Sequence, residues 1–262
     1  MRGCFGLRVM VHQLRRYAEW LLHPRPWAVG RGKLDEYPVL AVERSSPLQR
    51  APDGAISSYC AEKTRNLRLA CAKVDGLVIA PGEVFSFCRA VGPTTRQAGY
   101  LPALELRDGA LGPAVGGGLC QLANLLFLLA VQVNAEIIER HRHSYDLFRD
   151  VGRTVPFGCG ATVFYNYVDF QFRNTLPFPL LLRAAVEPPE LHSALYAREP
   201  LPFTATIVET DHRFFRRDGD IYRANRLWRD VAWHDGHTTH ELLFENECRV
   251  LYDAEDLVEE GA

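Results

Sequence analysis

Apolar residues recur along this chain with two different periods, helical in the first half and alternating in the second. Between residues 5 and 22 they recur every three or four positions, which predicts an amphipathic helix with arginines on its other face. Residues 57–74 repeat this spacing, with Ser57 or Ser58 as a suitable N-cap. The strongly apolar run at 119–133 predicts a buried helix that is too short to span a membrane.

Between and after these helices, the pattern predicts strands joined by turns. Asp108-Gly109 separates residues 100–107 from 110–115, which is a hairpin signal. Residues 135–143 alternate in a way that predicts one strand, with Glu139, His141 and His143 on the same face. From Thr162 onward, strand and turn patterns dominate. Further predicted strands are 38–43, 77–79, 84–87, 163–172, 180–186, 193–197, 203–208 and 249–252.

This order of elements predicts an α+β fold with N-terminal helices, a central cysteine-bearing helix and an antiparallel β-rich C-terminal half. We divide the chain into three parts. Residues 1–57 form an N-terminal amphipathic helix and linker, and residues 58–186 form the core domain. Residues 187–262 form a β-rich extension packed on that core.

Composition narrows the class of protein. The 262 residues carry a net charge of −2 and no basic run or nucleic-acid-binding motif, so we expect no nucleic-acid partner. The seven cysteines are an odd number with no CxxC pair, which favours free thiols in a reducing compartment. Arginines interrupt the N-terminal apolar stretch too early for a signal peptide, so we expect a cytoplasmic protein. The helix within 5–22 either packs on its own domain or lies peripherally on an anionic membrane.

Candidate chemistry centres on Cys120. It follows Gly116-Gly117-Gly118-Leu119 directly, which places it at the first turn of the predicted buried helix, behind a flexible glycine hinge. A helix N-terminus offers unpaired N–H groups and a partial positive charge. Both favour the thiolate, which is the nucleophilic form of cysteine. Cys120 is therefore the candidate nucleophile, and its alternative role is that of a small core residue.

His141 and His143 follow about twenty residues later and are candidate general bases. A thiol at a helix start with histidines further along suits a cysteine-dependent acyl transferase or hydrolase. A metal site built from Cys120, His141 and His143 has suitable ligand types, but the spacing fits no zinc pattern. We expect no metal and no cofactor.

Several ordered motifs then give the chain a resemblance to a known family. They run from about residue 58 to 186 and together resemble the VanW family, named for an accessory protein of B-type vancomycin resistance clusters. The motifs are Asn66-Leu67-Arg68-Leu69-Ala70, Pro81 to Phe87, Gly116 to Gln121, Glu139 to His143, Ala161-Thr162-Val163 and Asp169 to Asn174.

The resemblance implies a role in peptidoglycan metabolism or glycopeptide resistance. Some secreted members are thought to be L,D-transpeptidases, in which Cys120 here would attack a stem-peptide carbonyl with His141 or His143 as base. The alternative is a non-enzymatic accessory protein that binds a cell-wall precursor. Either way the partner is a peptidoglycan peptide or its precursor. The implied oxyanion and substrate-binding residues are Gly117, Gly118, Gln121, Asp169 and Arg173.

Two positions depart from the family pattern. Many members carry Ser-Thr one turn after the Cys-Gln pair, where this chain has Leu122-Ala123-Asn124-Leu125. Many also carry an aspartate before Ala-Thr-Val, where this chain has Gly160. If that aspartate orients the catalytic histidine, this chain needs another acid, and Asp169 and Glu139 are the candidates.

Overall fold

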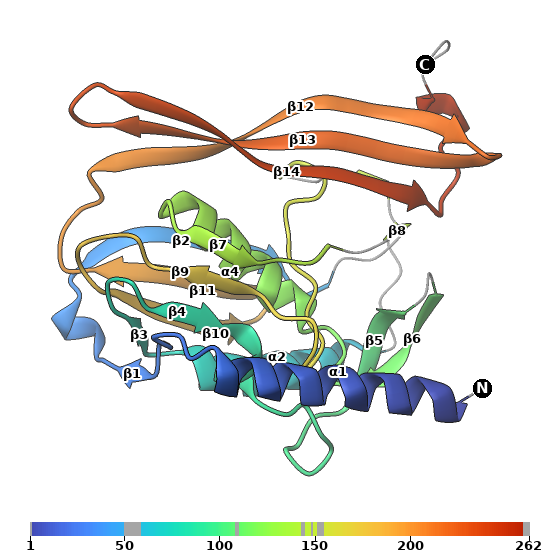
Figure 1. The fold of residues 1–262 in the computed structure, drawn as a ribbon, viewed down its shortest axis with the longest axis horizontal. Helices are drawn as coiled ribbons and strands as arrows, with labels where there is room; N and C mark the ends of the chain where they lie inside the picture. Colours follow the sequence, from blue (N-terminus) through green and yellow to red (C-terminus); the bar gives the residue numbers. More distant parts are fainter. Residues whose placement is uncertain are drawn as a thin grey trace.

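The computed structural model describes residues 2–49, 59–107, 110–142, 145–147, 149–150 and 155–258, with side chains described from Val9 onward except at Arg107. The fold is α+β. Its helices are α1 (Arg2–Leu22), α2 (Cys60–Val74), α3 (Phe87–Val91) and α4 (Cys120–Gln132), with short 3-10 turns at Leu34–Glu36 and Glu255–Leu257. α1 and the strand ribbon near the C-terminus lie on opposite sides of the molecule, with α4 between them (Figure 1).

A five-stranded antiparallel sheet forms the floor of the core. Its order is β1-β3-β10-β11-β2, so two central strands from late in the chain lie between strands from its start. The strands are β1 (Gly30–Arg31), β2 (Val39–Pro47), β3 (Leu77–Ile79), β10 (Leu180–Glu187) and β11 (Glu190–Ala197). This sheet crosses both domain boundaries expected from the sequence, because β2 precedes residue 58 and β11 follows residue 186.

Three further sheets, each with fewer strands, complete the fold. A long ribbon has the order β12-β13-β14-β8, in which only the β14–β8 pair is parallel. A three-stranded sheet has the order β4-β9-β7, and β5 pairs with β6 as a hairpin. The strands are β4 (Val84–Ser86), β5 (Pro102–Arg107), β6 (Ala110–Val115), β7 (Glu136–Glu139), β8 (Tyr145–Asp146), β9 (Gln171–Arg173), β12 (Phe203–Arg217), β13 (Asp220–Trp233) and β14 (Thr238–Val250).

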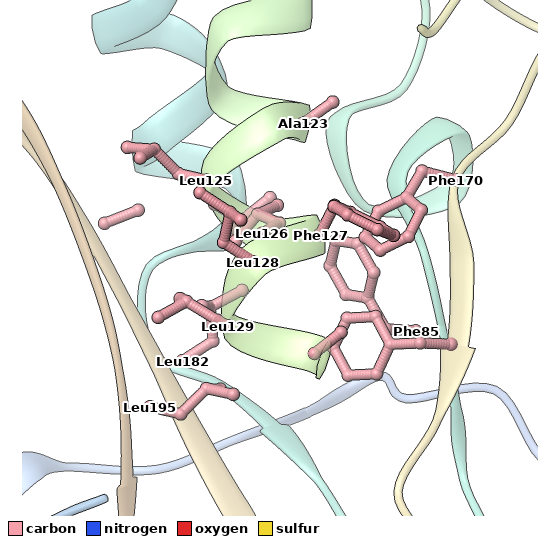
Figure 2. Packing of buried hydrophobic residues seen from close by; sticks show 14 of the residues in the cluster. Phe85, Ala123, Leu125, Leu126, Phe127, Leu128, Leu129, Phe170, Leu182 and Leu195 are labelled. Atoms are coloured by element: carbon pink, nitrogen blue, oxygen red, sulfur yellow. The ribbon is translucent and has the colours of Figure 1, made fainter. Parts of the chain in front are cut away.

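The helix α4 is the centre of the hydrophobic core. Nine of its thirteen residues are buried and apolar, so it is covered on nearly every side, as a helix without a polar face must be. Figure 2 shows Phe85, Phe127 and Phe170 gathered on one side of it, and Leu182 and Leu195 of the sheet on another. The buried helix predicted from the apolar run is confirmed, with Cys120 as its first residue.

Two strand predictions are wrong, and both errors fall near the predicted site. The strand expected at 135–143 ends at Glu139, after a register shift between Ile137 and Glu139. Instead of one strand over 163–172, the chain turns back at Phe164–Val168 and then forms only β9. By contrast, the hairpin around Asp108-Gly109 is confirmed in its strands, while the two turn residues and the Ser57 and Ser58 caps lie outside the described residues.

Candidate functional site

A large cavity lies beside the N-terminus of α4. Its volume is about 950 Å³, within the range of small-ligand sites in proteins. It is bounded by the first turns of α4, the end of β2, the β5–β6 hairpin and the loop that carries residues 155–163. Cys120 lies in its wall, so the thiol faces a space that is large enough for a peptide-sized ligand.

The glycine segment before Cys120, residues 116–118, forms a turn that is held by contacts with its surroundings. Gly116 and Gly118 have positive φ angles of 82° and 90°, which explains the preference for glycine. Asn66, fully buried on α2, donates from Nδ2 to the Gly117 carbonyl over 3.0 Å. A Cβ on Gly117 would lie 2.1 Å from the Ala103 carbonyl oxygen. These contacts hold the glycine segment in a defined turn at the start of α4, where a flexible hinge was expected.

Cys120 itself is only weakly engaged. Its thiol donates to the Val163 carbonyl oxygen over 3.9 Å. Burial raises the pKa of the Cys120 thiol to about 11. The resting protein therefore holds Cys120 as a thiol rather than as the thiolate expected from its position.

Two polar groups in the cavity wall have no hydrogen-bond partner within the described residues. Thr162 is 6% exposed and its hydroxyl is unpaired. The Gln121 side-chain oxygen is buried and unpaired, whereas its Nε2 donates to Ser46 Oγ over 2.6 Å and to the Pro47 carbonyl over 2.8 Å. Because buried polar groups are normally satisfied, both atoms are suited to contact a ligand.

Arginines supply positive charge to the same cavity. Arg140 donates from Nε to the Gly160 carbonyl over 2.8 Å and from Nη1 to Asn246 Oδ1 over 3.2 Å, and its guanidinium lies 4.4 Å from the centre of the Phe244 ring. No carboxylate contacts it among the described residues, and burial lowers the pKa of Arg140 to about 10. Arg142 also lines the cavity. This end of the cavity therefore favours an anionic group.

Sequence reasoning missed Arg140 and Thr162 as cavity residues. The signal was present, because both lie within motifs that carry the family resemblance. Arg140 was assigned to the face of a strand opposite His141, and the histidine face was taken as the site. With β7 ending at Glu139, Arg140 and Arg142 line the cavity and His141 between them does not.

His141 has another partner. Its Nε2 lies 3.0 Å from Glu139 Oε1, and its side chain is 47% exposed. Among the described residues, no imidazole lies within hydrogen-bonding distance of the Cys120 thiol. His143 lies outside the described residues. The described part of the chain therefore contains no Cys–His pair.

Glu139 belongs to a polar network that attaches α1 to the body of the protein. Arg16 forms a bidentate ion pair with Glu139 at 2.6 and 2.5 Å, and Gln171 Nε2 donates to Glu139 over 3.2 Å. Burial alone would raise the pKa of Glu139, but the hydrogen bond from His141 and the pairing with Arg16 lower it overall.

Asp169 is the fully buried centre of this network. Its carboxylate accepts hydrogen bonds from Ser86 Oγ (2.5 Å), the Cys88 N–H (2.8 Å) and Gln171 Nε2 (2.9 Å), and from its neighbour, the Phe170 N–H. Burial raises the pKa of Asp169 in spite of these bonds. Asp169 lies outside the cavity wall, so its described contacts serve to connect β4, α3 and β9.

The two departures from the family pattern are in contact. Asn124, one turn after Cys120, accepts the Ala161 N–H at Oδ1 over 2.8 Å. A Cβ on Gly160 would lie 2.4 Å from the same oxygen. The Asn124 amide thus fills the space that a side chain at position 160 would need, and it anchors the cavity loop to α4.

The remaining predicted residues have structural contacts. The Gly117 N–H donates to the Ala114 carbonyl over 2.9 Å, whereas Gly118 lines the cavity. Arg173, partly exposed, pairs with Glu136 on the neighbouring strand at 2.5 Å. The structure thus brings Cys120, Gln121 and Gly118 together in the cavity and leaves Asp169, Arg173 and His141 outside it. Within the described ranges, no group of three His, Cys, Asp or Glu side chains is arranged to hold a metal ion.

Comparison with known proteins identifies relatives. The profile of a family described as "VanW like protein" matches residues 62–196. The "Vancomycin B-type resistance protein VanW" of Enterococcus faecalis is 28% identical over 224 residues, which are 85% of this chain and 82% of that protein. The "Uncharacterized protein YoaR" of Bacillus subtilis is 35% identical over 125 residues, 47% of this chain and 39% of that protein. No solved structure matches the chain significantly.

Proposed function

This chain belongs to the VanW family, and we propose that it contributes to glycopeptide resistance by binding the peptide part of a peptidoglycan precursor in the cavity beside α4. The observation that carries this proposal is the unpaired hydroxyl of Thr162, buried in a cavity of about 950 Å³. A stem peptide offers amide groups for Thr162 and Gln121, and a terminal carboxylate for the Arg140 and Arg142 side.

Thr162→Val tests this binding role. The substitution keeps the shape of the side chain and removes the unpaired hydroxyl, so we expect the stability of the free protein to stay within about 1 kcal/mol or to rise. Binding of a synthetic stem pentapeptide ending in D-Ala-D-Ala, measured by calorimetry, should weaken about fivefold or more. The matched control is Thr175→Val, because the Thr175 hydroxyl already donates to the Asn134 carbonyl away from the cavity.

Equal peptide affinity of wild type and Thr162→Val would contradict the assignment of Thr162. Absence of any measurable peptide binding by the wild type would contradict the binding role itself. A loss of affinity in Thr175→Val as large as in Thr162→Val would identify the effect as a general consequence of substitution.

A second candidate function is acyl transfer of the L,D-transpeptidase type, and the position of Cys120 favours it. In that reaction the Cys120 sulfur forms a thioester with the stem-peptide carbonyl, and the C–N bond to the terminal D-alanine breaks. The departing amine takes the proton lost by the thiol. An acceptor amine then attacks the thioester and returns the sulfur as a thiol. The pKa of about 11 requires that ligand binding or a base activates the thiol.

Cys120→Ala and Cys120→Ser separate the two functions. If the protein acts by binding, both variants should keep peptide affinity and any resistance phenotype at normal protein level. If it acts by acyl transfer, both should lose the phenotype with little change in melting temperature, and mass spectrometry of the wild type should detect an acyl adduct on Cys120.

A further inference from the structure

The N-terminal helix α1 presents its apolar face to solvent. Leu14 is 60% exposed and Leu21 is 81% exposed, and the helix also exposes Met10, Val11, Tyr17 and Leu22. Met10, Val11, Leu14, Leu21 and Leu22 follow one another at intervals of one, three or seven positions, so they form one stripe along the helix. Tyr17 borders this stripe, and its hydroxyl shares a hydrogen bond with that of Tyr165 over 2.7 Å. A helix that packed on its own domain in the usual way would bury this stripe.

The opposite face of α1, which contacts the body, uses polar groups. Arg16 is buried and pairs with Glu139, and Gln13 Nε2 donates to the Tyr165 carbonyl over 2.8 Å. His12 stacks on Tyr167 with ring centres 5.6 Å apart. Trp20 packs on the same face, with its ring centre 6.2 Å from that of Trp27. The inward attachment of α1 is therefore largely polar, while most of its aliphatic side chains point outward.

The same helix carries an excess of positive charge. Residues 2–22 contain four arginines and one glutamate, whereas the whole chain has a net charge of −2. Arg15 is exposed beside the apolar stripe and has no ion-pair partner among the described residues, while Glu19 lies near Arg16 and Arg25. Apolar side chains flanked by arginine are typical of helices that lie in the plane of an anionic bilayer surface.

We propose that the exposed stripe of α1, Met10, Val11, Leu14, Leu21 and Leu22, docks on the surface of an anionic lipid bilayer. The helix lies parallel to the bilayer and inserts this stripe, with Arg15 at the level of the lipid headgroups. In the described part of the chain, no helix is long and apolar enough to cross a membrane, so the attachment is peripheral. The polar contacts through Arg16 and Gln13 hold the body of the protein against the docked helix.

Vesicle flotation with the full chain tests this proposal. The wild type should float with vesicles of phosphatidylglycerol and phosphatidylethanolamine, and much less with vesicles of phosphatidylcholine alone. Leu14→Asp or Leu21→Asp should reduce the bound fraction about tenfold, because each places a charge within the inserted stripe. Arg15→Ala should reduce it less, and 0.5 M salt should remove most of the preference for anionic lipid.

Leu242→Asp is the matched control, because Leu242 is 41% exposed on β14, in the ribbon on the other side of the molecule. It should bind vesicles as the wild type does, and all variants should keep the wild-type melting temperature. Failure of the wild type to bind anionic vesicles would overturn the proposal. So would equal binding of Leu14→Asp and Leu242→Asp. A dimer that Leu14→Asp dissociates, seen by sedimentation without vesicle binding, would assign the stripe to a second copy of the chain instead.

Discussion

The cavity wall and the network around Asp169 use polar groups in opposite ways. At the cavity, Cys120 has one long contact, and Thr162 and one atom of Gln121 have no partner in the described chain. In the network, Asp169 accepts four hydrogen bonds and Glu139 holds Arg16 in a bidentate pair. The comparison distinguishes two kinds of motif residue. The polar groups of one kind form hydrogen bonds within the fold, and those of the other kind are left available to a ligand.

Asp169→Ala should have the largest effect. It leaves the donors of Ser86 and Cys88 buried without this acceptor and leaves Gln171 Nε2 with only its longer bond to Glu139, so we expect a loss of at least about 3 kcal/mol in the free energy of unfolding. Urea unfolding measures this. Arg173→Ala is the control in the same sheet, because its exposed ion pair with Glu136 should contribute less than about 1 kcal/mol. If Asp169→Ala lost as little stability as Arg173→Ala, the network around Asp169 would not be a major source of stability.

Gly160→Ala should destabilise the protein by about 1–3 kcal/mol, because the new methyl group would displace the Asn124 amide and break its bond to the Ala161 N–H. In a background that already carries Asn124→Ala, the same substitution should cost less. Thermal or urea unfolding of the two single variants and the double variant measures this coupling. Simple additivity would show that residues 124 and 160 do not constrain one another.

Acidification should weaken the attachment of α1 through Glu139. The folded-state pKa of Glu139 is lowered below its ordinary value of 4.5, so its stabilising contribution is full above that value and is lost as pH falls through the folded pKa. Glu139→Gln should therefore flatten the decline in stability as the pH falls below 5, measured by urea unfolding at each pH.

Asp169 has the opposite sign, because its raised pKa makes protonation favour the folded state. Because the charge of Glu139 contributes to this raised pKa, the difference between wild type and Glu139→Gln reports Glu139 together with its effect on Asp169. Parallel stability curves for the two proteins would contradict the lowered pKa.

Cys120→Ala should have the smallest effect on stability, within about 1 kcal/mol, because the thiol makes only one weak contact. The reactivity of the Cys120 thiol can be tested separately. With a pKa of about 11, the rate of Cys120 alkylation by iodoacetamide should rise about tenfold per pH unit from pH 7 to 10. Peptide mass spectrometry assigns the label. A rate that levels off near pH 7 would identify an activated nucleophile and favour acyl transfer.

The parts of the fold that local pattern decides were predicted from the sequence. The apolar run gave α4, with Cys120 at its start, and Asp108-Gly109 gave the β5–β6 hairpin. In both cases neighbouring residues along the chain decide the structure. The sequence predicts correctly that α1 is amphipathic. It does not predict which face of α1 contacts the body, because that depends on the pairing of Arg16 with Glu139, 123 residues away.

The assignment of His141 and Asp169 to the site depended on where their side chains lie relative to the cavity, which the sequence alone does not specify. The alternation of residues 140–142 was predicted correctly, but which of its two faces meets the cavity was not, because the cavity wall is assembled from distant segments. Burial raises the pKa of Cys120, and the carbonyl that its thiol contacts belongs to Val163, 43 positions away in the chain. Asn124 and Gly160 were noted separately as departures, and only the fold shows that they touch.

The strand order of the five-stranded sheet has a consequence for biosynthesis. Three of its strands, β1, β2 and β3, are synthesised before residue 80, whereas β10 and β11, which lie between β3 and β2, follow only at residues 180–197. The apolar helix α4 is made in between, before the surface that covers it exists. At roughly 5–20 residues per second, the nascent chain exposes this helix for several seconds. The β10–β11 hairpin therefore covers one side of α4, and the later strands β12 to β14 add Phe203, Val231 and Phe244 to the core. Translation that stalls before these strands leaves a chain prone to aggregation.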